Sequence, residues 1–534
     1  MSKSRSLISI ASIVALATLI SKVFGLVRQQ AIAAAFGVGP AVDAYNYAYV
    51  IPGFLLILLG GINGPFHSAI VSVLSKRERE DAAPLVETIT TLVGTVLLGV
   101  TVFLILFAAP CVDLVAPGLS QTETGIAIRD IAIQQFRIMA PMALLSGLIG
   151  IGFGTLNAAD MYWLPSVSPL FSSLTLIIGL GGMAIYLGEE MTQPQYAVLG
   201  GLVLAWGTLA GAFLQWLIQV PAVWRSGLGT LRLRFEFNRP GVQEVTRVML
   251  PATLSSGMLQ INVYTDLFFA SYIPQAAAAM QYSGLLVQTP LGIISNVILV
   301  PFLPIFSRLA DPQDWPALKD RIRQALILTG ITMLPLSAIM VTLAFPIVRV
   351  VYERYAFDVE ASKFVTSLLV AYSVGMFVYL GRDVLVRVFY GLGDGKTPFR
   401  ISIINIFLNG FLDFVLVRSF GAPGLVLATV GVNVVSMVMM LWLLDVKLGG
   451  LPWRRWFWPF LGLTVASVIT GGVSWVTLWG VQQVLGDQGL IILLVELGIA
   501  TVAGLAVFAG IATQLRVPEV DLVAGKIRQK LRLS

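Results

Sequence analysis

The first apolar segment of the chain carries its polar side chains on one side only. On a helical wheel that advances about 100° per residue, six polar or small positions share an arc of about 120°. These positions are Thr18, Ser21, Lys22, Gly25, Arg28 and Gln29. Inside a bilayer, such a sector must face protein or water. Two cations without an acid on the same sector indicate an anion site, and Arg and Lys commonly bind phosphate.

The two cations also have a simpler interpretation. Arg28 lies about 21 residues along the segment, roughly 32 Å up a straight helix, and could reach the outer interface by snorkelling. Lys22, roughly 22 Å up, is less easily explained in this way. Asp43 begins the next apolar segment and is a candidate gate residue that either pairs with Arg28 or closes the outer side. Alternatively, it is an ordinary first-turn acid that favours the helix dipole.

A second set of polar residues lies within the later apolar segments. Asn409 and Asp413 are four residues apart and share a helix face, while Asp266 and Thr429 belong to two other segments. Their carboxylate, amide and hydroxyl oxygens suit a hard cation such as Na⁺ and are unsuited to zinc. The alternative is a pair of protonated, hydrogen-bonded acids. No cofactor is required by this chemistry, and Na⁺ is the candidate ion.

No group of residues in the sequence indicates an enzyme. The single His67 and the single Cys111 exclude a histidine metal cluster and an internal disulfide. The glycine-rich stretch at 391–395 follows an apolar helix instead of a strand, so it does not fit a phosphate-binding loop. Asp383 and Arg387 are four residues apart and are expected to pair along one helix.

The elements that must position these side chains are membrane helices. Of the 534 residues, 57% are hydrophobic and 12% are charged, whereas a soluble protein is about 25% charged. Fourteen apolar runs are long enough to span a bilayer. They cover residues 7–36, 43–74, 86–110, 126–157, 165–187, 196–223, 241–272, 276–308, 320–352, 362–391, 398–418, 422–445, 456–482 and 488–515. Because lipid offers backbone groups no hydrogen-bond partner, we predict an all-α integral membrane protein.

The sequence repeats itself at an offset of 234 to 236 residues. Four landmarks keep this register: Tyr47 with Tyr282, Pro65 with Pro301, Pro110 with Pro346, and Asp160 with Asp394. Six spans separate equivalent points, so both copies should have the same orientation about an axis along the membrane normal. A membrane protein with two such halves is usually a transporter whose substrate lies between them.

The repeat predicts an organisation in five parts. Residues 1–223 form an N-terminal lobe of six helices, and 224–247 form a linker. Residues 248–445 form a C-terminal lobe of six helices, followed by two added helices in 446–515. A basic tail covers 516–534.

Lys and Arg are concentrated on one side of the predicted topology. The connections on that side contain 24 of the 34 Lys and Arg residues, and the opposite connections contain 4. By the positive-inside rule, both termini are then cytoplasmic. No small-residue cleavage site precedes Ser21, so the first segment is interpreted as a span and not as a signal peptide. The net charge of +6 is explained by topology, without a nucleic-acid partner.

Three stretches resemble a known family. They are 21–28 with Phe36-Gly37 and Asp43-Ala44, then 371–375, and then 387–398, which contains Arg387, Asp394, Lys396, Thr397 and Pro398. These stretches are similar to the lipid II flippase family MurJ, also called MviN, of the MOP exporter superfamily. The span count and the two added C-terminal helices also fit, so the resemblance covers nearly the whole chain.

The resemblance implies alternating-access transport of lipid II, an undecaprenyl-pyrophosphate-linked disaccharide-pentapeptide, to the outer leaflet of the bacterial inner membrane. Arg28 and Lys22, with Ser21 and Gln29 beside them, would line a central cationic cavity, and Asp43 would lie near the outer gate. A groove along the last two spans would hold the lipid tail. The implied partners are the substrate, the bilayer and the cell-wall synthesis machinery.

Some members of the family bind Na⁺ in the C-terminal lobe, and the spacing of Asn409, Asp413 and Thr429 agrees with such a site. Other positions depart from the family. Leu56 and Leu285 stand where many members have Arg, and Gln288 stands where an acid is often found. With fewer cations at these positions, the protein would bind pyrophosphate more weakly, so another lipid-linked oligosaccharide remains an alternative substrate.

Two further alternatives concern the class of protein. A cation-coupled drug exporter of the same superfamily would favour acids in the N-terminal cavity, and the basic first helix argues against it. A membrane glycan transferase would need a catalytic residue in a sizeable outer loop. The longest outer connections, 111–125 and 349–363, are too short for this.

Overall fold

The computed structural model describes residues 7–61, 64–74, 77, 79–258, 261–486, 489–515 and 518–520. The described residues form helices and connecting turns and no β-strand, which confirms the all-α prediction. Contacts divide the chain into two compact units. Unit 1 contains the described residues up to Ala278 together with Arg354–Phe357, and unit 2 contains Ala279–Glu353 and the described residues from Asp358 onward.

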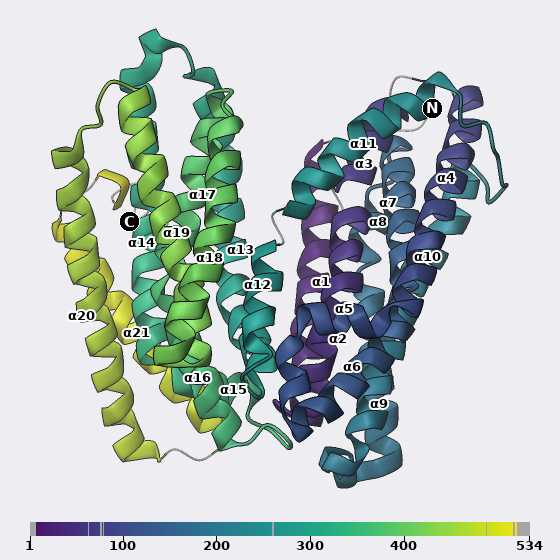
Figure 1. Cartoon of the computed structure of the whole chain (residues 1–534). Helices are drawn as coiled ribbons and strands as arrows, with labels where there is room; N and C mark the ends of the chain where they lie inside the picture. Colours follow the sequence, from purple (N-terminus) through teal and green to yellow (C-terminus); the bar gives the residue numbers. More distant parts are fainter. Residues whose placement is uncertain are drawn as a thin grey trace. The chain divides into compact units, whose positions relative to one another are not determined.

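Unit 1 contains twelve α-helices among its described residues (Figure 1). They are α1 (Leu7–Phe36), α2 (Pro40–Gly60), α3 (Pro65–Leu74), α4 (Arg79–Leu106), α5 (Ala108–Val115), α6 (Glu123–Met139), α7 (Met142–Ala158), α8 (Trp163–Val167), α9 (Leu170–Leu187), α10 (Ala197–Ser226), α11 (Pro240–Met258) and α12 (Ile261–Ala270). Short 3-10 turns, η1 (Pro117–Gln121), η2 (Gly188–Thr192) and η3 (Pro194–Tyr196), lie in the connections.

Helix α13 (Ala276–Arg308) begins at the end of unit 1 and continues into unit 2. The other helices of unit 2 are η4 (Pro312–Asp314), α14 (Trp315–Thr342), α15 (Ala344–Tyr352), α16 (Val359–Val374), α17 (Met376–Gly391), α18 (Lys396–Phe420), α19 (Ala422–Lys447), α20 (Trp453–Leu485) and α21 (Leu490–Gln514). The last two pack side by side, and α20 also packs against α14.

The helices are long and apolar enough for a multi-pass membrane protein. In the described residues, ten meet a length and composition test for crossing a membrane, or twelve if two bent pairs each count as one span. The two remaining predicted spans, 7–36 and 241–272, correspond to α1 and to α11 with α12. Each of the fourteen predicted spans therefore coincides with a helix or with two consecutive helices.

The helices of the two copies of the repeat break at equivalent positions. Helix α4 ends next to Phe107 and α14 ends next to Leu343, which are 236 residues apart and have nearly the same backbone angles. The break between α2 and α3 at Pro65 has its counterpart in α13, which bends by 49° before Pro301. Proline favours such breaks because it removes a helix hydrogen bond.

One landmark of the repeat is shifted by one residue in the structure. After α7 the left-handed residue is Asp160, with φ 59°, and after α17 it is Gly393, with φ 72°. The next residue donates to the helix in both turns, from Met161 N to Leu156 O and from Asp394 N to Phe389 O. Asp160 therefore corresponds to Gly393, and the predicted match with Asp394 was wrong. Asp and Gly both tolerate this conformation.

The units do not divide the chain at the linker predicted for 224–247. Helices α11 and α12 follow that linker in sequence and are grouped with unit 1 by their contacts. Helix α11 packs against α3, and Val242 of α11 joins an apolar cluster of unit 1.

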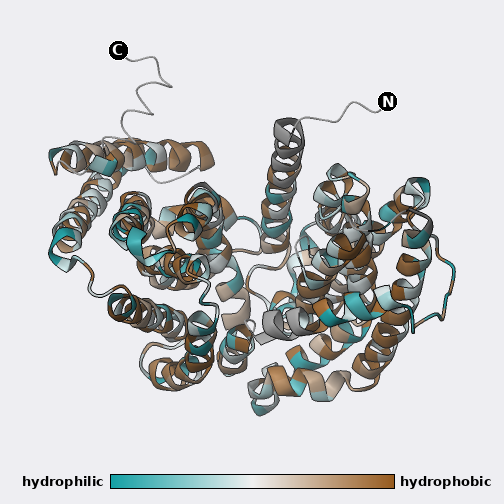
Figure 2. Cartoon of the chain, turned by 90° about the horizontal axis from the view of Figure 1, so that it is seen from above, coloured by the Kyte–Doolittle hydropathy of each residue, from teal (hydrophilic) through white to brown (hydrophobic). Residues whose placement is uncertain are grey.

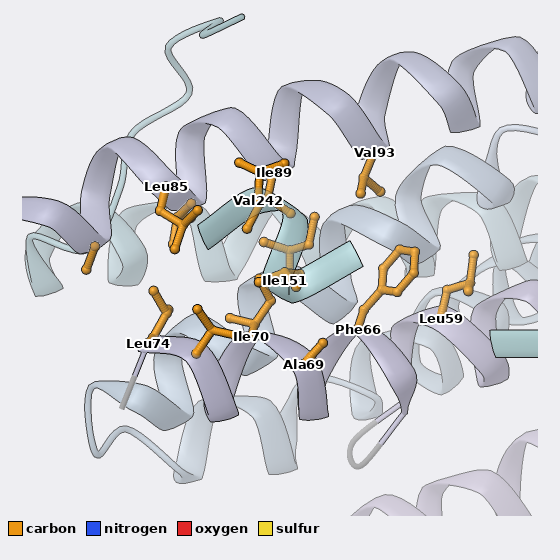
Figure 3. Packing of buried hydrophobic residues seen from close by; sticks show 14 of the residues in the cluster. Leu59, Phe66, Ala69, Ile70, Leu74, Leu85, Ile89, Val93, Ile151 and Val242 are labelled. Carbon is orange, nitrogen blue, oxygen red and sulfur yellow. The ribbon is translucent and has the colours of Figure 1, made fainter. Parts of the chain in front are cut away.

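Figure 3 shows this cluster, which α2, α3, α4, α7 and α11 build together. Phe66 and Ile70 of α3 point toward Ile89 of α4 and Ile151 of α7. Figure 2 shows that apolar residues also cover much of the outside of the helices. In α20 and α21, for example, Val468 and Val502 are more than two-thirds exposed. Exposed valines on long apolar helices fit a surface that faces lipid.

Candidate functional site

The polar sector of α1 is also its better-buried side. Gln29 is 2% exposed, and Arg28 and Ser21 are partly buried, whereas Leu19, Val23 and Val27 on the apolar side are exposed. Helix α1 packs against α8 and α9, which fixes this orientation. Ser21, Arg28 and Gln29 of the polar sector are therefore turned toward the protein.

Within this sector, Arg28 lacks a counter-ion in the described part of the chain. No ion pair includes Arg28, and its buried Nε has no hydrogen-bond partner there. Ser21 Oγ and Gln29 Nε2 are also buried without a partner. At Gly25, between Ser21 and Arg28, no other atom lies within 4 Å of the place that a Cβ would take. Polar groups and a cation thus border open space. Lys22, at the edge of the polar sector, is exposed.

Two tyrosines of α2 lie near Arg28, and sequence analysis did not identify them. Both are close enough to Arg28 for an electrostatic interaction with the guanidinium. Tyr45 and Tyr49 are stacked, with ring centroids 5.4 Å apart. The Tyr45 hydroxyl is hydrogen-bonded to Thr208 of α10 at 2.9 Å. The sequence did hold a signal for this pair, because residues four apart share one helix face.

Asp43 is buried at the start of α2, with 1% of its surface exposed. Its carboxylate accepts hydrogen bonds from the backbone N–H groups of Gln275 at 3.2 Å and Ala278 at 3.1 Å. These groups belong to the turn before α13 and to its first helical turn. No ion pair joins Asp43 to Arg28 in the described residues. The carboxylate therefore caps α13, where the helix dipole also favours negative charge.

The predicted cation ligands are divided between the two units. In unit 2, Asn409 and Asp413 are buried on one face of α18, and Asn409 Nδ2 donates to Asp413 Oδ2 at 2.9 Å. Thr429 of α19 donates to Leu425 O at 3.3 Å, while Asp266 belongs to α12 in unit 1. The structure thus brings Asn409 and Asp413 together directly. In the described chain, no three His, Cys, Asp or Glu residues gather as a metal site.

The stretch from Arg387 to Pro398 has a structural role. Asp394 accepts hydrogen bonds from Thr397 N at 3.0 Å and Thr397 Oγ1 at 2.9 Å, and from Lys447 Nζ at 2.7 Å. Burial raises the pKa of Asp394, but the bonds from Lys447 and Thr397 outweigh it and lower the pKa to about 2. Asp394 thus joins the start of α18 to the end of α19.

Three other residues of this stretch lie on α17 and α18. Lys396 is exposed and Pro398 is buried in the first turn of α18. Arg387 is partly buried on α17. Asp383 forms an ion pair with its neighbour Arg382, whose Nη1 lies 3.4 Å from Asp383 Oδ1, and it also interacts electrostatically with Arg387, the predicted partner.

An apolar cavity of about 490 Å³ lies along the two last helices. Its lining residues are mostly on α20, with two near the end of α21: Trp458, Pro459, Leu461, Gly462, Val465, Ile511 and Leu515. The cavity lies in the part of the chain where the sequence analysis expected a lipid-tail groove.

The three positions that depart from the family have unremarkable surroundings. Leu56 and Leu285 are partly buried, and Gln288 is exposed. None of these three residues carries a charge, so none of them adds to the cations of the α1 sector, Arg28 and Lys22.

A buried carboxylate that the sequence analysis missed holds the connection between α10 and α11. Glu87 of α4 accepts hydrogen bonds from Thr230 N at 3.2 Å, from the Thr230 hydroxyl and from Arg234 Nε at 3.2 Å. Arg234 N also donates to Thr91 Oγ1 at 3.0 Å. These bonds attach the non-helical connection to α4. An acidic residue early in an apolar helix was the available signal.

Comparison with known proteins agrees with these features. The family model described as "Lipid II flippase MurJ" matches residues 32–496. A probable lipid II flippase MurJ from Synechocystis is 60% identical to the chain, over 99% of the chain and 98% of the relative. The lipid II flippase MurJ of Burkholderia cenocepacia is 28% identical, over 86% and 88% of the two chains.

Solved structures show the same fold. An inward closed conformation of lipid II flippase MurJ aligns with a TM-score of 0.75 at 21% identity, over 94% of this chain and 99% of that one. An inward-facing MATE multidrug transporter of the MOP superfamily aligns with a TM-score of 0.60 at 16% identity, over 80% and 94%. With a relative of 60% identity along nearly its whole length and a family match over most of its residues, this chain belongs to the MurJ family of lipid II flippases.

Proposed function

We propose that this protein moves lipid II from the inner to the outer leaflet of a bacterial inner membrane by alternating access between its two halves. The observation that carries the proposal is the Arg28 guanidinium, a partly buried cation beside open space on α1 that has no counter-ion among the described residues. A charge in a membrane helix costs about 2.5–3.5 kcal/mol or more, so a function is the usual reason for keeping it. The family supplies the substrate class.

In this proposal, Arg28 and Lys22 bind the pyrophosphate of the substrate. Arg offers several N–H donors in a planar arrangement that matches phosphate oxygens. Ser21 Oγ and Gln29 Nε2, buried without partners beside Arg28, are available to donate to the same anion. A neutral or acidic wall in this place would favour a cationic drug instead.

Asp43 serves as the outer gate. Its two hydrogen bonds attach the start of α2 to the start of α13. Separation of the start of α2 from the start of α13 would break both bonds and leave a buried carboxylate, unless water or another group replaces the N–H donors. The bonds thus favour the closed state until substrate binding offsets their loss.

Na⁺ binding would couple to this cycle through the oxygens of Asn409, Asp413 and Thr429, the predicted ligands that belong to unit 2. The hydrogen-bonded pair of Asn409 and Asp413 offers hard oxygens of the type Na⁺ prefers. No other cofactor is required. The apolar cavity along α20 and α21 fits a polyprenyl tail, which needs hydrocarbon contacts alone.

The concentration of Lys and Arg in alternate connections supports a topology with both termini in the cytoplasm. In that orientation, the substrate enters from the cytoplasmic leaflet, where its headgroup is assembled, and leaves toward enzymes that polymerise it outside. The cell-wall synthesis machinery is therefore the expected partner.

Complementation tests the function. A bacterium depleted of its own lipid II flippase would express the wild type, Arg28→Ala, Asp413→Ala or the control Arg232→Ala, which alters an exposed linker residue. We expect rescue by the wild type and the control, no rescue by an equally abundant Arg28→Ala, and weaker rescue by Asp413→Ala that responds less to Na⁺ than rescue by the wild type does. Failure of a well-expressed wild type would overturn lipid II as the substrate and favour another lipid-linked oligosaccharide.

A further inference from the structure

The tyrosine pair beside Arg28 is not used by the proposed function so far. Tyr45 is buried and its hydroxyl is bonded to Thr208. Tyr49 is only partly buried, and its hydroxyl makes no hydrogen bond to any described residue. Of the two phenols near the guanidinium, one is thus occupied and the other is available as a donor.

The position of the Tyr49 ring is set by two neighbours. One face stacks on the Tyr45 ring, with an interplanar angle of 18°. The ring also lies over Gly53, one turn further along α2, where a Cβ would stand 2.2 Å from Tyr49 Cε1. A side chain at position 53 would displace the ring. The stacked tyrosine therefore supports one face of the Tyr49 ring, and the glycine leaves room for the ring in this position.

An anion at Arg28 would gain from a neutral donor of this kind. A phosphate oxygen accepts several hydrogen bonds, and those to a charged acceptor are stronger than those between neutral groups. A phenol adds such a bond without a second buried charge, which would repel Arg28 and cost desolvation. The aromatic body of Tyr49 also packs against hydrocarbon while its hydroxyl remains polar.

We propose that the Tyr49 hydroxyl contacts the substrate and donates a hydrogen bond to the anion held by Arg28, with Tyr45 and Gly53 as the residues that position it. The inference rests on the proposed function, in which that anion is the pyrophosphate of a polyprenyl-linked glycan. It assigns to α2 a part in substrate recognition that complements the cations of α1.

Binding to the purified full chain in lipid nanodiscs tests this contact. The probes are lipid II and undecaprenyl pyrophosphate, which share the pyrophosphate and differ in the glycan. Tyr49→Phe removes only the hydroxyl, and we expect affinities about tenfold weaker for both probes. The control Tyr186→Phe, at an exposed tyrosine of α9, should leave both affinities unchanged.

Gly53→Ala supplies a second, independent variant. Displacement of the ring should weaken binding about as much as Tyr49→Phe does, and the double variant should be no weaker than Gly53→Ala alone. Such non-additivity distinguishes a shared contact from two separate structural defects. The dependence of affinity on salt should stay as in the wild type for Tyr49→Phe and become shallower for Arg28→Ala.

The outcomes separate this contact from the proposed function. Wild-type affinity of folded Tyr49→Phe for both probes would overturn the Tyr49 contact and leave the function standing. A loss confined to lipid II would also overturn it, because the hydroxyl would then contact the glycan or peptide. Wild-type binding of undecaprenyl pyrophosphate without lipid II would overturn lipid II as the substrate, while a tenfold loss for the remaining probe would still support the Tyr49 contact.

Discussion

At the scale of single residues, the site is defined by what surrounds Arg28. Its neighbours are neutral phenols and small polar groups, and the nearest acid considered from the sequence, Asp43, is bonded elsewhere. A guanidinium in such surroundings attracts an anion, because no described residue compensates its charge.

Gly25 offers a test of the open space beside Arg28. Gly25→Leu places a side chain where no atom lies within 4 Å, so the fold should tolerate it while the space for the headgroup shrinks. We expect loss of lipid II translocation, measured by headgroup accessibility in cells, with normal abundance of the variant. Gly99→Leu, at an equally open glycine of α4, is the matched control and should keep activity. Full activity of Gly25→Leu would show that the substrate does not use this space.

At the scale of elements, the helices are held by a few polar bonds in addition to apolar packing. Asp394 joins α18 to α19, and Glu87 attaches the connection between α10 and α11 to α4. Hydrophobic attraction between helices is weak in lipid, because lipid tails are as apolar as the side chains. Bonds of this kind therefore determine where connections lie.

Glu87→Gln should loosen the connection between α10 and α11. The amide keeps the size of the side chain but loses the charge that binds Arg234, and the Thr230 bonds weaken. We expect trypsin to cut several-fold faster after Arg232 and Arg234, measured on the purified protein by mass spectrometry. Glu244→Gln, which removes an exposed ion pair to Arg77, is the control for a general effect of lost charge. Equal cutting rates in the wild type and Glu87→Gln would show that Glu87 does not attach this connection to α4.

At the scale of the whole molecule, the repeat and the gate belong together. Asp43 and Ala278 are 235 residues apart, the offset of the repeat, so Asp43 bonds to the backbone at its own equivalent position in the second copy. Capping at this place restrains the start of both equivalent helices, α2 and α13. In the proposed cycle, this one carboxylate would control opening at this end.

Accessibility of Ala277 tests the gate. Ala277 is 2% exposed and packs with Tyr47 and Leu119. In a Cys111→Ser background, Ala277→Cys should react slowly with a membrane-impermeant maleimide. Adding Asp43→Ala should speed labelling several-fold, because loss of the two capping bonds favours opening. Asp113→Ala, which removes an ion pair to Arg129 on α6, is the control. An unchanged labelling rate in Asp43→Ala would refute the gate role.

The sequence by itself determined the class of fold, the positions of the fourteen spans, the repeat and the polar sector of α1. These features follow from the spacing of apolar residues and the length of apolar segments, which can be read from a short stretch of sequence. A bilayer restricts both, because each span must be long enough to cross it and must satisfy its own backbone hydrogen bonds. It also identified Asn409 and Asp413 as one face of a helix, because four residues make about one turn.

Only the tertiary structure decided the partners of the polar groups. Asp43 caps α13, Asp383 forms an ion pair with Arg382, and Asp160 corresponds to Gly393. Tyr49 became a candidate because Tyr45, Gly53 and Arg28 converge on it in space. Hydrogen bonds and close packing join residues that are distant in sequence, and which donor meets which acceptor depends on ångström-scale placement that periodicity does not contain.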